Sequence, residues 1–205
     1  MTSLYLVTER YDYTEDKFLK ILEEACQAGI DYIQLREKDT ATGAFYQLAL
    51  KVKAITTKYA VPLIINDRLD IALAIDAEGL HLGQSDLPLQ KARELFGDDK
   101  IYGVSAKTIQ QAKDAEKNGA TYLGSGAVFP TQTKASTPIG IEGLTAITQA
   151  VSIPVLAIGG LDSSNIPHLK GTGISGIAVV SDIMQAENVT EKVQVLRKQL
   201  EEMEQ

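Results

Sequence analysis

The sequence predicts an α/β protein in which residues 1–205 form a single closed parallel sheet, a (β/α)8 or TIM barrel. Short β-branched apolar runs alternate with longer amphipathic segments along the whole chain, which is the pattern of repeated βα units. The 205 residues fit one domain, and no linker, change of composition or low-complexity segment divides them. About eight units, each of roughly 25 residues, suit a small barrel of this type.

The expected strands are short apolar runs bounded by Gly, Pro or Asp, and they are too short to form stable helices. They lie at residues 4–7, 32–35, 62–65, 79–82, 101–104, 122–124, 154–158 and 176–180. An open, doubly wound sheet is the alternative architecture. That fold carries a glycine-rich fingerprint after its first strand, and Val7-Thr8-Glu9-Arg10 is not one.

The expected helices are the amphipathic stretches between these strands, at residues 14–28, 41–59, 89–96, 108–118 and 189–204. Thr14, Glu15 and Asp16 suit a first helical turn, where a hydroxyl can cap free N–H groups and acids favour the positive end of the helix dipole. Gly29 and Asn118-Gly119 suit helix ends. A further short helix is expected to begin near Ser181.

Composition argues against several classes of protein. The net charge is -7 and no run of Lys or Arg forms a basic stripe, so nucleic acid is not an expected partner. No apolar run reaches the roughly 18 residues of a membrane helix, and the first residues do not resemble a signal peptide, so no membrane partner is expected. Cys26 is the only cysteine, which excludes an intramolecular disulfide and indicates a cytoplasmic protein. We expect Cys26 to fill space on the core face of a helix.

Polar residues gather where the expected strands end, which is where barrels of this type place their chemistry. Side chains alternate along a strand, so Gln34, Arg36 and Lys38 share one face. If Leu35 packs toward the outer helices, these three side chains point into the barrel mouth, where two cations suit an anionic ligand such as a diphosphate. The alternative is a solvated strand end with an ion pair to Glu37.

Two carboxylates follow neighbouring expected strands. Asn66 and Asp67 come directly after the third strand, and Asp86 follows the fourth. Asp67 and Asp86 together indicate a Mg²⁺ site, because magnesium commonly takes one or two carboxylates, several waters and phosphate oxygens. The alternative is that each aspartate caps the helix that follows it. His81 lies within the fourth strand, so we expect it to make a structural hydrogen bond rather than bind a metal.

The later strand ends add hydroxyls and one more cation. Ser105 follows the fifth strand, and its hydroxyl is expected either to contact a ligand or to cap a helix. Residues 125–140 are the longest irregular segment, and such loops in a compact barrel are usually functional, often as lids. Within this segment Thr131 and Thr133 offer hydroxyl donors to a phosphate and Lys134 offers charge.

Glycines after the seventh strand and Ser181 after the eighth predict a second anion site. Gly159 and Gly160 allow backbone N–H groups to approach a ligand closely. Loops after the seventh and eighth strands of such barrels often hold phosphate. The sequence therefore predicts one site of cations and metal that suits a diphosphate, and another of backbone N–H groups that suits a monophosphate.

Taken in order, the strand-end motifs resemble those of the thiamine phosphate synthase family, and they span nearly the whole chain. The motifs are Gln34-Leu35-Arg36-Glu37-Lys38, Ile65-Asn66-Asp67-Arg68, His81-Leu82-Gly83-Gln84-x-Asp86, Gly103-Val104-Ser105, Val128-Phe129-Pro130-Thr131-x-Thr133-Lys134, Ala157-Ile158-Gly159-Gly160 and Val179-Val180-Ser181. Ala127 and Leu161 stand where many members have proline and isoleucine, which affects loop shape and substrate fit.

The resemblance implies a barrel enzyme that joins a hydroxymethylpyrimidine diphosphate to a thiazole monophosphate by dissociative substitution, with Mg²⁺ bound by Asp67 and Asp86. The residues implied to hold the pyrimidine diphosphate are Gln34, Leu35, Arg36, Glu37, Lys38, Asn66, Ser105 and Lys134. The residues implied around the thiazole phosphate are Thr131, Gln132, Thr133, Gly160, Val180 and Ser181. Those implied in catalysis are Arg36, Lys38, Ser105 and Lys134.

Two other functions are weighed against this one. A thiazole tautomerase of the same superfamily has a histidine shortly after the fifth strand, where this chain has Ala106 and Lys107. A non-catalytic regulatory barrel is expected to lose its metal ligands first, and Asp67 and Asp86 are both present. Small phosphorylated molecules are the predicted partners, and the sequence leaves open whether the protein forms a homo-oligomer.

Overall fold

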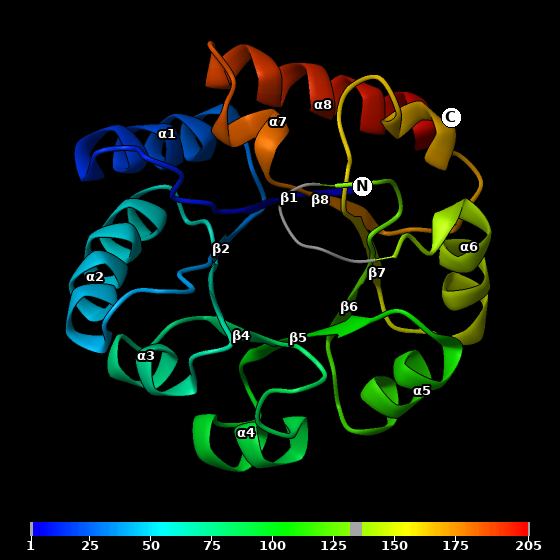
Figure 1. The fold of residues 1–205 in the computed structure, drawn as a ribbon, viewed down its shortest axis with the longest axis horizontal. Coiled ribbons are helices and arrows are strands. Elements are labelled where there is room, and N and C mark those ends of the chain that lie inside the picture. The colour runs from blue at the N-terminus through cyan, green and yellow to red at the C-terminus, as the bar shows by residue number, and fades with distance from the viewer. Residues whose placement is uncertain (1, 132–136, 205) are drawn as a thin grey trace.

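Eight parallel strands close into a barrel in the computed structural model, which describes residues 2–131 and 137–204 (Figure 1). The strands are β1 (Ser3–Val7), β2 (Tyr32–Leu35), β3 (Leu63–Asn66), β4 (Gly79–Leu82), β5 (Ile101–Ala106), β6 (Tyr122–Gly126), β7 (Val155–Ile158) and β8 (Gly176–Val179). Each strand pairs with the next, and β1 pairs with β8, so the sheet has no free edge. The predicted (β/α)8 barrel is confirmed, and the doubly wound alternative is wrong.

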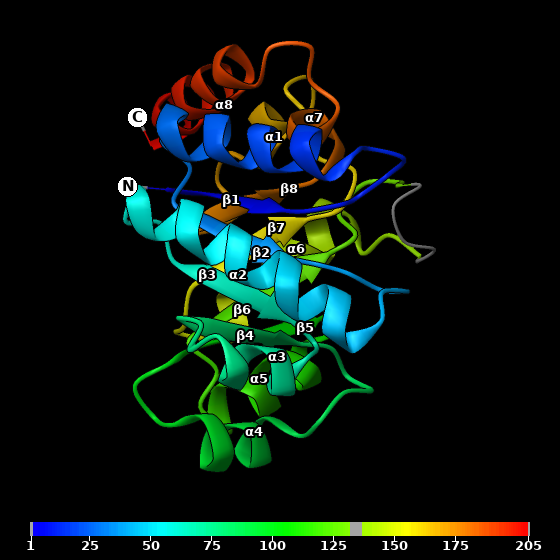
Figure 2. The same cartoon turned by 90° about the vertical axis from the view of Figure 1, so that its left-hand side faces the viewer.

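Helices surround the barrel on its outside (Figures 1 and 2). They are α1 (Glu15–Ala28), α2 (Thr42–Lys58), α3 (Leu69–Ala74), α4 (Leu89–Phe96), α5 (Ile109–Lys117), α6 (Gly140–Ala150), α7 (Ser181–Met184) and α8 (Val189–Glu204), with a 3₁₀ turn η1 (Ile166–Leu169) between β7 and β8. Helices α3 and α6 were not expected. The first has six residues, too few for a periodic pattern, and the second begins at Gly140 and holds several β-branched residues that disfavour helix.

The helix ends that the sequence indicated are formed as expected. The Thr14 hydroxyl accepts a hydrogen bond from the Lys17 N–H at 3.3 Å and caps α1. Gly29 ends this helix with a left-handed φ of 101°, a conformation that glycine adopts without strain. Thr108 caps α5 in the same way as Thr14 caps α1, through the Gln111 N–H at 3.1 Å.

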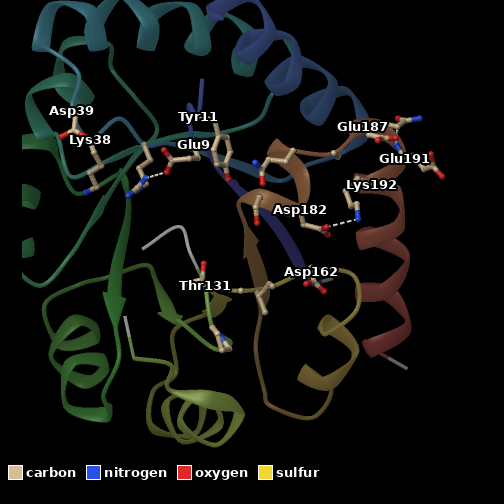
Figure 3. A pocket seen from close by; sticks show the side chains of 18 residues that line it. Glu9, Tyr11, Lys38, Asp39, Thr131, Asp162, Asp182, Glu187, Glu191 and Lys192 are labelled. Carbon is tan, nitrogen blue, oxygen red and sulfur yellow. Dashed lines mark hydrogen bonds and ion pairs between the residues drawn. The ribbon is translucent and has the colours of Figure 1, made fainter. Parts of the chain in front are cut away.

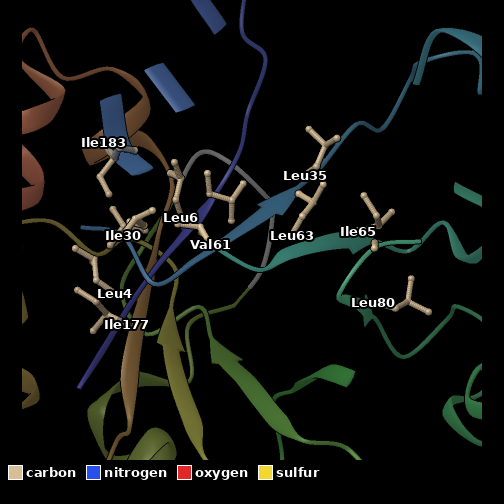
Figure 4. Packing of buried hydrophobic residues seen from close by; sticks show 14 of the residues in the cluster. Leu4, Leu6, Ile30, Leu35, Val61, Leu63, Ile65, Leu80, Ile177 and Ile183 are labelled. Carbon is tan, nitrogen blue, oxygen red and sulfur yellow. The ribbon is translucent and has the colours of Figure 1, made fainter. Parts of the chain in front are cut away.

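Alternating side chains give the barrel two apolar layers. One set, including Leu4, Leu35 and Leu63, faces outward and packs against the helices (Figure 4). The other set faces inward and fills the barrel with a smaller cluster around Tyr5 and Tyr122. Because the period of a strand is two, successive side chains of a strand alternate between the inside and the outside of the barrel.

Side-chain acceptors just before even-numbered strands bind the N–H groups of their odd-numbered neighbours. Asp31, before β2, accepts from the Leu4 N–H at 2.7 Å. Glu78, before β4, accepts from the Leu63 N–H at 2.9 Å, and Thr121, before β6, accepts from the Tyr102 N–H at 2.7 Å. These bonds hold strand starts that would otherwise leave donors unpaired at the end of the barrel opposite the predicted site.

Cys26 lies in the core at the end of α1, with 5% of its surface exposed. Burial raises the pKa of its thiol to about 12, so it stays protonated at neutral pH. The expected role as core filler is confirmed. Across residues 2–131 and 137–204, none of the helices combines the length and the apolar character needed to cross a membrane.

We predict that Gly103→Ala destabilises the barrel. A Cβ at this position would lie 2.2 Å from Cζ of Tyr122 and 2.3 Å from Nδ1 of His81, both inside the barrel. We expect the free energy of unfolding to fall by about 1–3 kcal/mol, the usual effect of overpacking a core. Chemical denaturation followed by circular dichroism measures it.

Gly43→Ala is the matched control, because a Cβ there has no atom within 4 Å and lies in the first turn of α2. It should leave stability unchanged or raise it slightly. Equal destabilisation by both substitutions would contradict the steric argument.

Candidate active site

A cavity of about 580 Å³ opens where the strands end, at the carboxyl side of the barrel. It brings together most of the side chains that the sequence predicted. The predicted residues that line it are Gln34, Arg36, Lys38, Asn66, Asp67, Asp86, Ser105, Thr131, Gly160, Val180 and Ser181. The cavity continues outward into a wider cleft beside the loop after β1 and helices α7 and α8 (Figure 3).

Two predicted residues within the described part of the chain, Leu35 and Glu37, are not among those that line this cavity. Leu35 is fully buried among the outer apolar side chains. Glu37 accepts a hydrogen bond from the Thr40 hydroxyl at 2.7 Å and pairs with Arg10 at 3.5 Å. The side chain of Leu35 therefore packs in the outer layer, and that of Glu37 holds its neighbours in place, while their contact with a ligand stays a prediction. Three other predicted residues, Gln132, Thr133 and Lys134, lie outside the described residues.

Both predicted cations at the mouth are paired with carboxylates. Arg36 forms an ion pair with Glu9 from the loop after β1, and its backbone N–H donates to the Thr8 hydroxyl at 3.0 Å (Figure 3). Lys38, after β2, forms an ion pair with Asp67, after the neighbouring strand β3. The cations are thus held in place by partners that an incoming anion can replace. Glu9 was not predicted, because nothing in the sequence joins it to a residue of the next strand.

The two predicted metal ligands lie together. Burial acts to raise the pKa of Asp67, but hydrogen bonds from Lys38 and with Asp86 outweigh burial and leave that pKa below its usual value. Burial and the neighbouring Asp67 raise the pKa of Asp86, against a hydrogen bond of 2.7 Å from the Gly83 N–H. Neither aspartate caps a helix, since Arg68 and Pro88 hold the positions before α3 and α4. The capping alternative is wrong for both.

This pair fits a magnesium ion that a ligand helps to bind. Among the described residues, no three side chains of His, Cys, Asp or Glu gather as a metal site. Two hydrogen-bonded carboxyl groups therefore leave most of a coordination shell to other donors. Mg²⁺ commonly binds in this way, through one or two carboxylates, waters and phosphate oxygens.

The opposite wall is made by backbone, where the loop after β6 packs on the loop after β7. The Phe129 N–H donates to the Gly159 oxygen at 3.0 Å. A Cβ on Gly160 would lie 2.4 Å from the Pro130 oxygen and 2.8 Å from the Phe129 oxygen, and its φ is 66°. Only glycine fits this approach without moving the loop.

His81 forms hydrogen bonds through both ring nitrogens, to Tyr122 and to Ser105, each at 2.9 Å. The expected structural hydrogen bond is confirmed. Gln84 and Lys107 also line the cavity, although the sequence reasoning gave neither a role. The signal for Gln84 was its place between the fourth strand and Asp86, and its amide donates to the Ser105 oxygen at 2.7 Å.

A closed parallel barrel with paired carboxylates, cations and a glycine wall at its carboxyl end defines an enzyme that acts on small phosphorylated substrates. Residues 4–183 match the family model described as thiamine monophosphate synthase. The chain belongs to this family.

Individual relatives agree with the family match. The chain is 52% identical to a thiamine-phosphate synthase of Enterococcus faecalis, over 98% of this chain and 95% of that protein. It is 55% identical to thiamine-phosphate synthase 2 of Streptococcus pneumoniae, over 96% and 94% of the two chains. The solved structure of a thiamine phosphate pyrophosphorylase from Pyrococcus furiosus is similar, with a TM-score of 0.89 and 39% identity over 98% of this chain and 96% of that one.

We predict that Gly160→Ala weakens the binding of a phosphorylated ligand. The new Cβ displaces the carbonyls of Phe129 and Pro130, which lie directly before Thr131, a residue that lines the cavity together with Gly160. We expect the Kd for a thiazole monophosphate to rise by about tenfold or more, which corresponds to the loss of roughly one well-placed hydrogen bond to a charged group. Isothermal titration calorimetry measures it.

Gly171→Ala is the control, because Gly171 also has a positive φ, of 83°, but a Cβ there meets no atom within 4 Å. It imposes the same kind of backbone strain away from the cavity. If both variants bound the ligand equally weakly, strain alone would account for the loss.

Proposed function

We propose that the protein is a thiamine phosphate synthase that works as a single (β/α)8 domain in the cytoplasm. It would join 4-amino-2-methyl-5-(diphosphooxymethyl)pyrimidine to 4-methyl-5-(2-phosphooxyethyl)thiazole and release diphosphate. The observation that carries this proposal is the lining of one cavity by Arg36 and Lys38, a pair of carboxyl groups and a glycine wall. The names of the relatives support the same reaction.

The diphosphate is assigned to the side of the cavity formed by β2, β3 and β4. Arg36 and Lys38 offer charged donors, and the carboxyl groups of Asp67 and Asp86 lie beside them. Since Lys38 is paired with Asp67, binding of a diphosphate with its metal exchanges one ion pair for two new ones. Only a ligand that brings both a negative charge for Lys38 and a cation for Asp67 replaces the ion pair between them with two new ones.

The thiazole phosphate is assigned to the wall formed by Gly160, Val180 and Ser181. Backbone N–H groups suit a monophosphate because they are fixed donors that need no reorganisation. Thr131 lines both the cavity and the wider cleft. It offers a hydroxyl between the side assigned to the diphosphate and the wall assigned to the thiazole phosphate.

The reaction is a substitution at the exocyclic carbon of the pyrimidine. The bond from this carbon to the diphosphate oxygen breaks and the diphosphate keeps the electron pair, which leaves a cation stabilised by the electron-rich ring. The thiazole nitrogen then donates its lone pair to the same carbon. No proton is transferred, so no general base is required.

The protein therefore contributes alignment and electrostatics. Arg36 and Lys38 stabilise the charge that develops on the departing oxygen, and Ser105 and Gln34 hold the ring side of the substrate. Asp67 and Asp86 would hold Mg²⁺, which supplies further neutralisation of the leaving diphosphate.

Replacing Lys38 by Met tests the assignment of the cations. We expect kcat/KM for the pyrimidine diphosphate to fall on the order of 10²-fold, the effect of one preorganised electrostatic group. Thiamine phosphate formed from both substrates is measured after oxidation to its fluorescent product. Lys58→Met is the matched control, because Lys58 is also a lysine paired with a carboxylate, Glu23, but lies on α2 far from the cavity lining.

Full turnover in the Lys38 variant would overturn this role. The same assay on the unaltered protein tests the function itself. Isomerisation of the thiazole without condensation would favour a tautomerase, and binding without turnover would favour a regulatory barrel.

Replacing Asp67 by Asn tests the metal site without relying on turnover. We expect the affinity for Mn²⁺ in the presence of inorganic diphosphate, measured by electron paramagnetic resonance, to fall by about 10–100-fold. Asp76→Asn is the control, because Asp76 shares both a positive φ and an ion pair to lysine with Asp67. Retention of the metal by the Asp67 variant would contradict the assignment, and Asp86→Asn should repeat the loss.

A further inference from the structure

Five polar side chains form one hydrogen-bonded chain across the inside of the barrel. Gln34 donates through Nε2 to the Tyr5 hydroxyl at 3.1 Å, and the hydroxyls of Tyr5 and Tyr122 are 2.7 Å apart. The Tyr122 hydroxyl lies 2.9 Å from Nδ1 of His81, whose Nε2 lies 2.9 Å from the Ser105 hydroxyl. We call this set (Gln34, Tyr5, Tyr122, His81 and Ser105) the interior chain.

The interior chain joins two walls of the active-site cavity. Gln34 on β2 and Ser105 on β5 both line the cavity, and so does His81 on β4. Tyr5 on β1 and Tyr122 on β6 lie below, within the inner cluster of the barrel. A contact made by a ligand at Gln34 is therefore linked through hydrogen bonds to the contact that it makes at Ser105.

Burial makes all the hydrogen bonds of the interior chain run in one common direction. Tyr5 is 1% exposed and Tyr122 is 8% exposed, so neither hydroxyl exchanges its partner freely with bulk water. Burial raises the pKa of both phenols far above neutral pH, and each therefore keeps one proton. A buried hydroxyl with one proton can donate only one hydrogen bond.

The protons can then be followed from one end of the chain to the other. Because Tyr5 accepts from Gln34, its own proton is donated to Tyr122. Because Tyr122 accepts from Tyr5, its proton is donated to Nδ1 of His81. A neutral imidazole that accepts at Nδ1 carries its proton on Nε2, so His81 donates to Ser105. The Ser105 proton is left to point toward the cavity.

We propose that Tyr5, Tyr122 and His81 are positioning residues that set the hydrogen-bonding polarity of the active site. They make Ser105 a donor into the cavity and hold the Gln34 amide with its oxygen available to accept. This inference rests on the proposed function and deepens it. The aminopyrimidine ring carries both ring-nitrogen acceptors and an amino donor, which suits a site with one donor wall and one acceptor wall.

The reverse direction is physically possible and makes an opposite prediction. It requires the Gln34 amide to turn over, so that its oxygen accepts from Tyr5. His81 would then carry its proton on Nδ1 and accept from Ser105. The tautomer of a single histidine therefore decides between the two directions.

The first experiment measures this tautomer in the intact protein by NMR of ¹⁵N-labelled histidine at pH 8. The chain has two histidines, so His168→Gln leaves the His81 signals alone. We expect a neutral ring protonated on Nε2. Protonation on Nδ1 would overturn the proposed polarity, and the result does not depend on enzymatic activity.

The second experiment removes the middle of the interior chain with Tyr122→Phe. We expect the KM for the pyrimidine diphosphate to rise by about tenfold, the effect of one misdirected hydrogen bond, while the KM for the thiazole phosphate is unchanged. We also expect the Nε2 tautomer of His81 to lose its dominance. Tyr5→Phe breaks the chain one step earlier and should shift the same KM, so the test stands even if one variant folds poorly.

Tyr102→Phe is the matched control. Tyr102 is also a buried tyrosine, but its hydroxyl donates to the Gly97 oxygen at 2.6 Å on the outside of the barrel. Loss of the Tyr102 hydroxyl should lower the stability of the protein and leave the KM values for both substrates unchanged. A Tyr122 variant that is folded, with both KM values and the His81 tautomer unchanged, would overturn the inference. Absence of thiamine phosphate synthesis in the unaltered protein would instead overturn the proposed function and leave the tautomer result standing.

Discussion

The alternation of side chains along eight short closed strands is the constraint on which the rest of the structure depends. Each strand has four to six residues, so it can send only two or three side chains inward and as many outward. The outward set builds the apolar layer against the helices. The inward set has to fill the barrel below and build the active site above. Whether a residue at the end of a strand lines the active site or packs against the helices therefore depends on whether its position along the strand is odd or even.

Charge is arranged around this constraint so that the site is stable without its ligands. An acidic protein with net charge -7 collects Arg36 and Lys38 at one opening. Glu9 and Asp67 pair with them, which avoids like-charge repulsion in a partly buried place. These carboxylates also keep the cationic side chains from spreading into solvent.

The sequence predicted all eight strands and much of the polar lining of the cavity because both follow from local periodicity and from the rule that chemistry sits at strand ends. It could not predict α6, whose glycines and β-branched residues form a helix only through packing on the barrel. It also placed Leu35 and Glu37 with the ligand contacts through family resemblance, although their side chains are directed to other protein groups. Glu9 and Tyr122 were missed because their partners are distant in sequence and only barrel closure brings them together.

The inside of the barrel raises a question that packing alone does not answer. Leu and Ile side chains would fill the same space, whereas buried hydroxyls and an imidazole are unfavourable unless every polar atom has a partner. Here two tyrosines and His81 satisfy one another, and Gly103 leaves room for them by having no Cβ. A hydrogen-bonded interior of this kind gives little net stability over an apolar one. What it does provide, with the proposed polarity, is direction, because each proton in it has one acceptor and the Ser105 proton points into the cavity. The polar interior is therefore better explained by the active site above it than by the stability of the barrel.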